Sequence, residues 1–244
     1  MVNENLQKLI DSNDSVWILE FLVSKEYVNS ILEIKTNISR SKWFALDIDE
    51  TLSATNYSYF DLILEKFWNP ENLSVDGMVK KYHMATNVPY YKNPEIESWF
   101  NEKRNCNDFQ FNIPLIENAD KIYQEIHEKH IDISLYITAR PETVKESTTL
   151  WLEKHNFPKA WIILKPSNLE FQYWNLWKAC VLDILYPEIQ WIVDDNPDLV
   201  KYLPKDYRGI VYAYSHTQDW GRDNVISCTS HEDVKTHIWT YFNK

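Results

Sequence analysis

Short apolar segments alternate along the chain with longer amphipathic ones. The apolar segments are continuous rather than alternating in polarity, which is typical of strands buried on both faces of a sheet. Five such segments are expected to be strands: residues 43–47, 132–137, 160–164, 189–193 and 209–214. Helical patterns lie between them, and two of these helices are expected to begin at Pro114 and Pro141. The alternation predicts an α/β fold, a parallel sheet flanked by helices, whose ligands bind at the carboxyl ends of the strands.

Two segments interrupt this alternation. Residues 1–40 have apolar positions at helical spacing and precede the first strand, so we expect a helical extension that packs on the core or forms an oligomer with a second copy. Residues 53–112 are far longer than a normal connection and contain helical patterns broken by prolines, which predicts an inserted cap. The core is then expected to comprise residues 41–52 and 113–244.

Composition narrows the possible partners and compartments. Among 244 residues, the formal charge of −11 and the absence of a basic run disfavour nucleic-acid and membrane partners. Three glycines are too few for a Gly-rich nucleotide-binding loop, and three widely separated cysteines form neither a disulfide framework nor a C-x-x-C metal site. The chain has no apolar run long enough to span a bilayer and no signal-peptide pattern at its start, so a cytoplasmic location is expected.

Acidic side chains follow two of the predicted strands. Asp47 and Asp49 come directly after the first strand, and Asp194 and Asp195 after the fourth, with Asp198 close behind. If these strands are neighbours, their carboxylates converge at one edge of the sheet and repel one another. A hard cation with oxygen ligands removes that repulsion, so the sequence predicts a Mg²⁺ site.

Complementary chemistry follows the second strand and precedes the fourth. Thr138 offers a hydroxyl and a backbone N–H near a helix start, which suits an anion. Lys178 lies in the helix that leads into the fourth strand, whereas Lys165 follows the third strand and is the alternative cation. Carboxylates, a divalent cation, a hydroxyl and a lysine together suit a phosphoryl group, because its transfer depends on positioning and charge neutralisation.

The segments FALDIDETL, LYITARP and WIVDDNPD, with Lys178 between the last two, resemble the four motifs of the haloacid dehalogenase superfamily of phosphatases. The resemblance covers roughly residues 43–215 and implies a Rossmann-like core. It implies that Asp47 is the nucleophile that forms an aspartyl-phosphate and that Asp49 is the general acid and then base. It further implies that Asp47, Asp194 and the Asp49 carbonyl bind Mg²⁺, while Thr138 and Lys178 hold the phosphate.

The insert stands where this superfamily carries its first type of cap, which selects the substrate. The D-x-D pattern argues against the dehalogenases and transport ATPases of the superfamily and for a phosphatase, with wording most similar to acid-phosphatase-type and 5′-nucleotidase-type members. Twelve aromatic residues in the insert line a substrate pocket or form the insert's own core.

For several residues the sequence leaves two interpretations open. Asp195 is a direct or an indirect metal ligand, and Asp198 a ligand or an acid at a helix start. Arg140 contacts phosphate or pairs with a surface acid, and Thr51 is expected to hydrogen-bond Asp49. No role is assigned to His127 and His130, because no third metal ligand accompanies them.

The function expected is Mg²⁺-dependent hydrolysis of a small phosphomonoester, with a nucleoside monophosphate as the first candidate and a sugar phosphate as the alternative. Two other functions stay open. One is a catalytically retired binding or regulatory protein that keeps the fold, and the other is a polynucleotide 3′-phosphatase.

Overall fold

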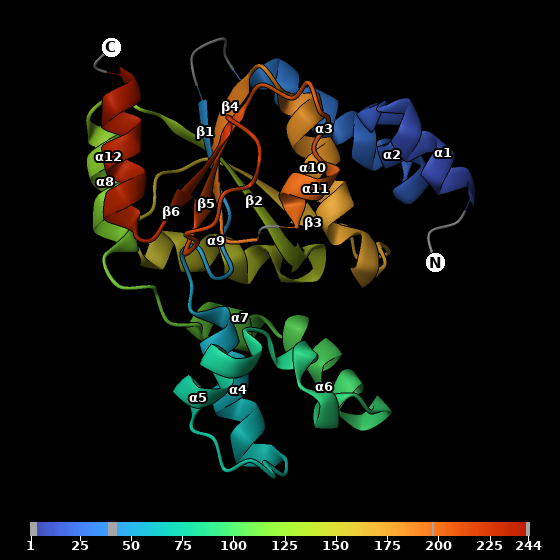
Figure 1. The fold of residues 1–244 in the computed structure, drawn as a ribbon, viewed down its shortest axis with the longest axis vertical. Coiled ribbons are helices and arrows are strands. Elements are labelled where there is room, and N and C mark those ends of the chain that lie inside the picture. Colours follow the sequence, from blue (N-terminus) through green and yellow to red (C-terminus); the bar gives the residue numbers. More distant parts are fainter. Residues whose placement is uncertain (1–3, 39–42, 197, 243–244) are drawn as a thin grey trace.

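The computed structural model describes residues 4–38, 43–196 and 198–242, and its centre is one parallel sheet (Figure 1). The strands run in the order β3-β2-β1-β4-β5-β6, and every neighbouring pair is parallel. They are β1 (Trp43–Leu46), β2 (Ile133–Pro141), β3 (Trp161–Lys165), β4 (Ile189–Asp194), β5 (Ile210–Tyr214) and β6 (Val225–Cys228). The α/β fold predicted from the alternation of strands and helices is confirmed.

One strand was missed by the sequence pattern. The five apolar segments correspond to β1 to β5, whereas β6 forms the edge of the sheet beside β5. Only the first and last of its four residues are buried. The strand has only four residues, Val-Ile-Ser-Cys, between polar segments, so its apolar run is too short to stand out in the sequence.

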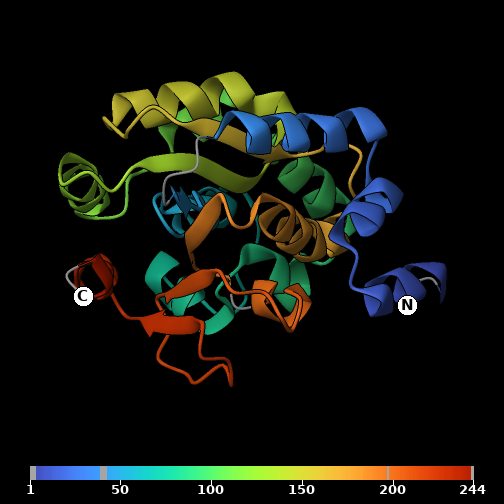
Figure 2. The ribbon, with the colours of Figure 1, turned by 90° about the horizontal axis from the view of Figure 1, so that it is seen from above.

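Helices cover both faces of the sheet. One face packs against α2 (Ser15–Leu22), α3 (Lys25–Asn37), α10 (Trp174–Leu185) and α11 (Leu199–Tyr202), with α1 (Glu4–Ser12) beside α2. The other packs against α8 (Ala119–Glu128), α9 (Lys145–Lys154) and α12 (His231–Phe242). The N-terminal and C-terminal helices therefore lie on opposite sides of the molecule (Figure 2). Within the described ranges, no helix is both long and apolar enough to cross a membrane.

The expected helix start at Pro114 is wrong, because α8 begins at Ala119. The carbonyl of Pro114 accepts a hydrogen bond from the N–H of Ala54, and the N–H of Ile116 donates one to the carbonyl of Leu52. The chain leaving the cap is therefore extended and paired with the chain entering it, which precludes helix there. These two paired segments join the cap to the core.

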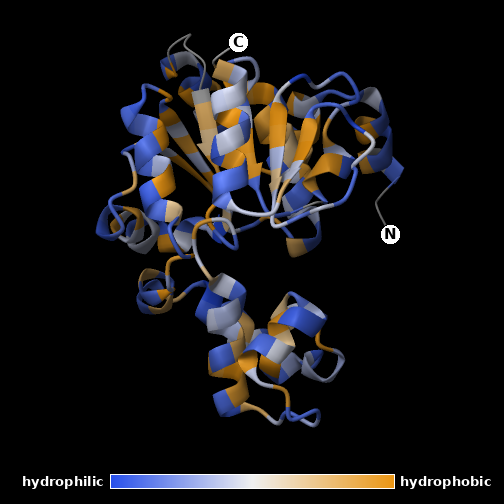
Figure 3. Cartoon of the chain, turned by 60° about the vertical axis from the view of Figure 1, so that its left-hand side comes forward, coloured by the Kyte–Doolittle hydropathy of each residue, from blue (hydrophilic) through white to orange (hydrophobic). Residues whose placement is uncertain are grey.

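The inserted segment forms a helical body with its own apolar core below the sheet (Figures 1 and 3). Its last helix, α7, packs against α9 of the core. Its elements are α4 (Thr55–Lys66), α5 (Val75–Tyr82), η1 (Ala85–Asn87), η2 (Pro89–Tyr91), α6 (Pro94–Arg104) and α7 (Asn107–Asn112). Most of its aromatic side chains lie in or against this core rather than facing the sheet. We call this body, residues 53–112, the cap.

Candidate active site

Two aspartates stand side by side at the carboxyl end of the sheet. In the β1–β4 pair, Leu46 is opposite Val193, and the N–H of Asp47 donates a 2.9 Å hydrogen bond to the carbonyl of Val193. The register therefore brings Asp47 next to Asp194, and both side chains are buried. Parallel pairing between β1 and β4 is what places residues 147 positions apart at one point.

Lys178 joins these two carboxylates from below. Its Nζ lies 2.5 Å from Oδ1 of Asp47 and 2.6 Å from Oδ2 of Asp194, and its side chain is 1% exposed. Burial opposes the charged form of the lysine, but the attraction of both carboxylates outweighs burial and raises the pKa of Lys178. The lysine therefore supplies a positive charge beside the two acids.

A third carboxylate belongs to the same cluster. Oxygens of Asp47, Asp194 and Asp195 all lie within 4.8 Å of one another. Burial raises the pKa of Asp47 and of Asp195, and the neighbouring acids add to the rise in both. One lysine faces three carboxylates, so the cluster has an excess of negative charge and the hard oxygen donors that a divalent cation requires. These residues fit Mg²⁺.

Asp49 stands above this cluster in a hydrogen-bonded frame. Its Oδ1 accepts from Thr55 Oγ1 at 2.6 Å, from Arg140 Nε at 2.9 Å and from Ser53 Oγ at 3.3 Å. Its Oδ2 lies 3.4 Å from Thr138 Oγ1. A quarter of the Asp49 side chain stays exposed, so the carboxyl group is held in place yet open to a substrate.

The predicted hydrogen bond from Thr51 to Asp49 is wrong. Thr51 Oγ1 instead accepts from the N–H of Asp195 at 3.2 Å and approaches its Oδ1 at 3.5 Å. Glu50 has a positive φ of 59°, and the N–H groups of Leu52 and Ser53 both return to the carbonyl of Ile48. This tight turn directs Thr51 towards β4 and leaves Ser53 and Thr55 to bind Asp49.

Of the two roles expected for Arg140, pairing with a surface acid is wrong. Arg140 is 2% exposed, and it pairs with Asp49, an acid of the site, rather than with a surface acid. Its Nη2 donates to Ser53 Oγ at 2.9 Å, and its guanidinium carbon lies 5.5 Å from the ring centroid of Trp151. Thr138 is fully buried and accepts from the N–H of Arg140 at 3.2 Å. The strand end LYITAR thus contributes two side chains to the frame around Asp49.

The structure separates the remaining candidates. Lys165 is buried, but its Nζ donates to the carbonyls of Pro166 and Leu169 at 2.9 and 3.2 Å rather than to an acid of the cluster. Asp198 is partly exposed and pairs with Lys201 at 2.5 Å, next to the start of α11. Neither belongs to the acidic cluster, whereas Lys178 and Asp195 do. Pro197, within the WIVDDNPD segment, lies outside the described residues.

Two more side chains border the cluster. His216, which follows β5, has its Nε2 2.6 Å from the carbonyl of Asp195. Glu50 accepts from the N–H of Asn56 at 2.6 Å, and burial raises its pKa to about 7. The sequence held a signal for His216, because it stands at the carboxyl end of a predicted strand just as Asp47 and Asp194 do.

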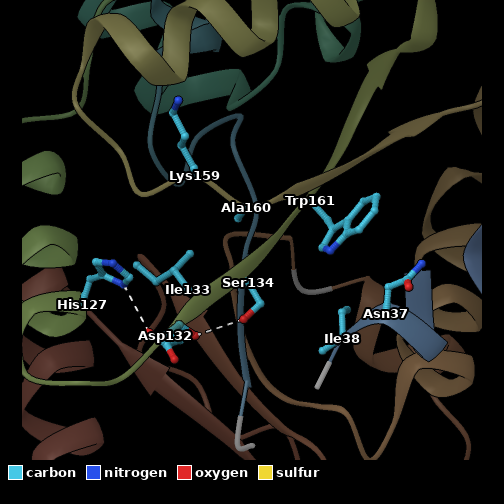
Figure 4. A pocket seen from close by; sticks show the side chains of 9 residues that line it. All are labelled: Asn37, Ile38, His127, Asp132, Ile133, Ser134, Lys159, Ala160 and Trp161. Carbon is cyan, nitrogen blue, oxygen red and sulfur yellow. Dashed lines mark hydrogen bonds and ion pairs between the residues drawn. The ribbon is translucent and has the colours of Figure 1, made fainter. Parts of the chain in front are cut away.

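A pocket of about 580 Å³ lies at the opposite, amino ends of the strands (Figure 4). Ile133 and Trp161 line it, and His127 Nδ1 lies 3.7 Å from Asp132 Oδ1 at its rim. His127 and His130 are both exposed and at a distance from the acidic cluster. The pocket is therefore separate from the candidate active site.

Comparisons with known proteins agree with this architecture. No protein-family model and no curated protein sequence matches the chain. Among solved structures, a Clostridium difficile protein named as a putative phosphatase is similar with a TM-score of 0.50 at 13% identity, over 82% of this chain and 99% of that chain. A HAD-superfamily hydrolase from Ehrlichia chaffeensis gives a TM-score of 0.44 at 14% identity, over 82% of this chain and 97% of that chain. The likeness to the Clostridium protein is one of fold.

Proposed function

We propose that this protein is a Mg²⁺-dependent phosphomonoester hydrolase of the haloacid dehalogenase type. The observation that carries the proposal is the arrangement of Asp47 and Asp194 around Lys178, with Asp49 held above them. The four sequence motifs and the fold of a named putative phosphatase support the same assignment. The proposal includes the substrate class, the metal and the covalent intermediate.

Asp47, Asp194 and the backbone carbonyl of Asp49 would hold Mg²⁺, and Asp195 is close enough to join them. The donor set fits because all of these ligands are oxygens and because the cluster has one lysine for three carboxylates. When bound, the cation would neutralise charge on the phosphoryl oxygens of the substrate.

In the proposed reaction a carboxylate oxygen of Asp47 attacks the phosphorus atom. The new O–P bond forms as the ester O–P bond breaks, and the departing oxygen takes a proton from Asp49. Water then attacks the phosphorus of the aspartyl-phosphate and gives its proton to Asp49, which releases phosphate and regenerates Asp47. The hydrogen bonds from Thr55 and Arg140 orient the Asp49 carboxyl group for both proton transfers.

Thr138 and Lys178 are proposed to hold the phosphate. Thr138 Oγ1 lies 3.4 Å from Asp49 and beside the strand end that faces the acidic cluster. Lys178 has three N–H donors, and Asp47 and Asp194 occupy two of them. The third donor has no hydrogen-bond partner among the described residues and is proposed to bind a phosphoryl oxygen, which also places the lysine's charge next to the group being transferred.

The cap limits the substrate to a small ester. It joins the core through the paired segments near Ala54 and Pro114, and α7 rests on α9. A substrate must therefore fit between cap and core. A nucleoside monophosphate is the first candidate and a sugar phosphate the alternative, whereas a polynucleotide 3′-phosphate requires a more open cleft.

Release of phosphate from 4-nitrophenyl phosphate, with EDTA and then with added Mg²⁺, tests the proposal. Turnover that EDTA stops and Mg²⁺ restores is expected. Binding of Mg²⁺ without turnover of any phosphomonoester would instead identify a retired binding protein. A panel of mononucleotides, sugar phosphates and 3′-phosphorylated oligonucleotides then identifies the substrate, and the highest kcat/KM on the oligonucleotides would contradict the closed-cap argument.

A further inference from the structure

Arg104 lies where the cap meets the core. It ends α6, and its guanidinium carbon is 5.0 Å from the ring centroid of Phe171, which begins η4 (Phe171–Tyr173) of the core. The next residue, Asn105, accepts a 2.5 Å hydrogen bond from Thr143 Oγ1. Thr143 is three residues beyond Arg140, so this corner of the cap touches the core beside the strand end that frames Asp49.

An aromatic surface connects this corner with the reacting groups. The ring of Tyr59 packs against Phe109 and Phe100, at centroid distances of 4.9 and 5.6 Å. Burial raises the pKa of Tyr59, while Arg104 opposes the rise and Asp49 adds to it. The Tyr59 hydroxyl therefore interacts electrostatically with both Arg104 and Asp49.

Arg104 has no carboxylate partner in the part of the chain that the structure describes. Across residues 4–38, 43–196 and 198–242, no acidic side chain comes within 4.0 Å of its guanidinium. By contrast, Lys81 of the cap pairs with Glu71 at 2.5 Å, and Lys103 pairs with Glu102 at 3.9 Å. The cap contains six cations, and among the described residues Arg104 is the one whose cation–π contact is with a ring of the core.

Arg104 interacts electrostatically with Lys165 of the core. Burial lowers the pKa of Lys165, and the positive charge of Arg104 lowers it further. Glu142 acts on the same lysine in the opposite direction and accepts a 3.4 Å hydrogen bond from the N–H of Ser167. A half-buried guanidinium that stacks on an aromatic ring keeps its planar donors for a carboxylate or a phosphate.

We propose that Arg104 binds a second anionic group of the substrate while a flat part of the leaving group packs against Tyr59 and Phe109. The substrate class is then a phosphomonoester whose leaving group carries both a ring and a carboxylate or second phosphate. This inference rests on the proposed phosphatase function. It makes Arg104 a specificity-determining residue, distinct from the groups that cleave the ester.

Two pairs of substrates test the proposal. The first pair is 4-carboxyphenyl phosphate and 4-carbamoylphenyl phosphate, which are similar in size and differ in charge. The second is a nucleoside 5′-monophosphate and the corresponding 3′,5′-bisphosphate, so that the pairs distinguish a carboxylate from a second phosphate. For each pair, the kcat/KM of the ester with the additional charge is divided by the kcat/KM of its partner. Comparing this ratio between wild type and Arg104→Gln cancels the intrinsic reactivity of the esters.

For at least one pair, we expect wild type to favour the charged ester about tenfold in kcat/KM, mainly through KM, as for one charge-assisted contact. Arg104→Gln should abolish this preference, and Arg104→Lys should retain part of it. Lys103→Gln is the matched control, one residue away and already paired with Glu102, and should change nothing. 4-Nitrophenyl phosphate should be hydrolysed equally well by Arg104→Gln.

Equal losses on both members of each pair would show that Arg104 only locks the cap to Phe171, and would overturn the proposal. Equal kcat/KM values within both pairs for wild type would overturn it as well. In either case turnover of 4-nitrophenyl phosphate leaves the phosphatase function intact. No Mg²⁺-dependent release of phosphate from any of the five esters would overturn both the phosphatase function and this inference.

Discussion

The Nζ of Lys178 lies 2.6 Å from Oδ2 of Asp194, although the lysine is in the middle of α10 and the aspartate ends β4. The helix packs beneath the sheet and points this one polar side chain towards the strand end, among eight other buried residues of α10. A lysine is stable there only because Asp194 and Asp47 compensate its charge. The burial of Lys178 therefore depends on the two aspartates, and the burial of the aspartates depends on Lys178.

Lys178→Met should both stop turnover and destabilise the protein. Without metal, we expect the free energy of unfolding to fall by about 3 to 5 kcal/mol, because buried carboxylates lose their counter-charge. Urea denaturation with and without Mg²⁺ measures this, and Mg²⁺ should recover part of the loss. Lys165→Met is the control, since the hydrogen bonds of Lys165 within the described residues go to backbone carbonyls, and this variant should keep turnover. The reverse ranking of the two variants in turnover would transfer the phosphate-binding role to Lys165.

Asp47→Asn should abolish hydrolysis and leave the fold intact. The amide removes the nucleophilic oxygen with almost no change in volume, so we expect kcat to fall by at least about a thousandfold. Phosphate release measures activity, and circular dichroism reports the fold. Retention of more than a few per cent of wild-type activity would exclude Asp47 as nucleophile.

Asp49→Asn should impair substrates according to their leaving groups. An alkyl phosphate needs a proton on its departing oxygen, so its kcat/KM should fall by about 10² to 10⁴. The loss on 4-nitrophenyl phosphate should be smaller, because nitrophenolate departs without protonation. Equal losses on both esters would mean that Asp49 only organises the hydrogen bonds with Arg140 and Thr55.

Mg²⁺ should raise the melting temperature of the wild-type protein. At about 100 times Kd, binding to the folded state adds about 2.7 kcal/mol, which corresponds to roughly 5 to 10 °C for a chain of this size. Asp194→Asn should abolish the shift, whereas Asp198→Asn should retain it, because Asp198 pairs with Lys201 outside the cluster. Ca²⁺ should shift the melting temperature without supporting turnover, since its looser coordination misaligns the nucleophile. An equal shift in both variants would contradict the assigned metal site.

His231 should make the protein less stable in acid. Burial lowers its pKa to about 4 from 6.5, with its ring stacked on Tyr214 and its Nδ1 3.1 Å from the Tyr123 hydroxyl. Between pH 6.5 and 4, His231 therefore binds a proton in the unfolded chain but not in the folded chain. The stabilisation present above pH 6.5 is lost as the pH falls towards 4. Between pH 7 and 5 the loss is about 2 kcal/mol.

Urea denaturation at several pH values compares wild type with His231→Phe, which should lack this part of the pH dependence. Tyr123→Phe removes the hydrogen bond but keeps the imidazole, so it should lose stability without losing the pH dependence. An unchanged pH dependence in His231→Phe would show that another group is responsible.

Much of the candidate site follows from local sequence. A continuous apolar run followed by acidic residues indicates a buried strand that ends in acids. The carboxyl ends of parallel strands lie at the same edge of the sheet. Asp47, Asp49, Asp194 and Thr138 were all found in this way. The spacing of apolar residues likewise predicts the helices of the cap and of the N-terminal segment.

Other features were decided only by the packed molecule. In the sequence, both Lys178 and Lys165 are candidates for the phosphate-binding cation. Only the packing of α10 beneath β1 and β4 gives Lys178 two carboxylate partners, whereas Lys165 binds backbone carbonyls. The partners of Asp49 depend on the turn after Ile48, whose hydrogen bonds direct Thr51 away from Asp49 and bring Ser53 to it. They also depend on the end of β2, which supplies Arg140. Only the contact with Phe171, at the end of α6, distinguishes Arg104 from the other cations of the cap. The sequence determined which residues end the strands, because that information is local, whereas the tertiary structure decided which charges meet, because those contacts join residues far apart in the chain.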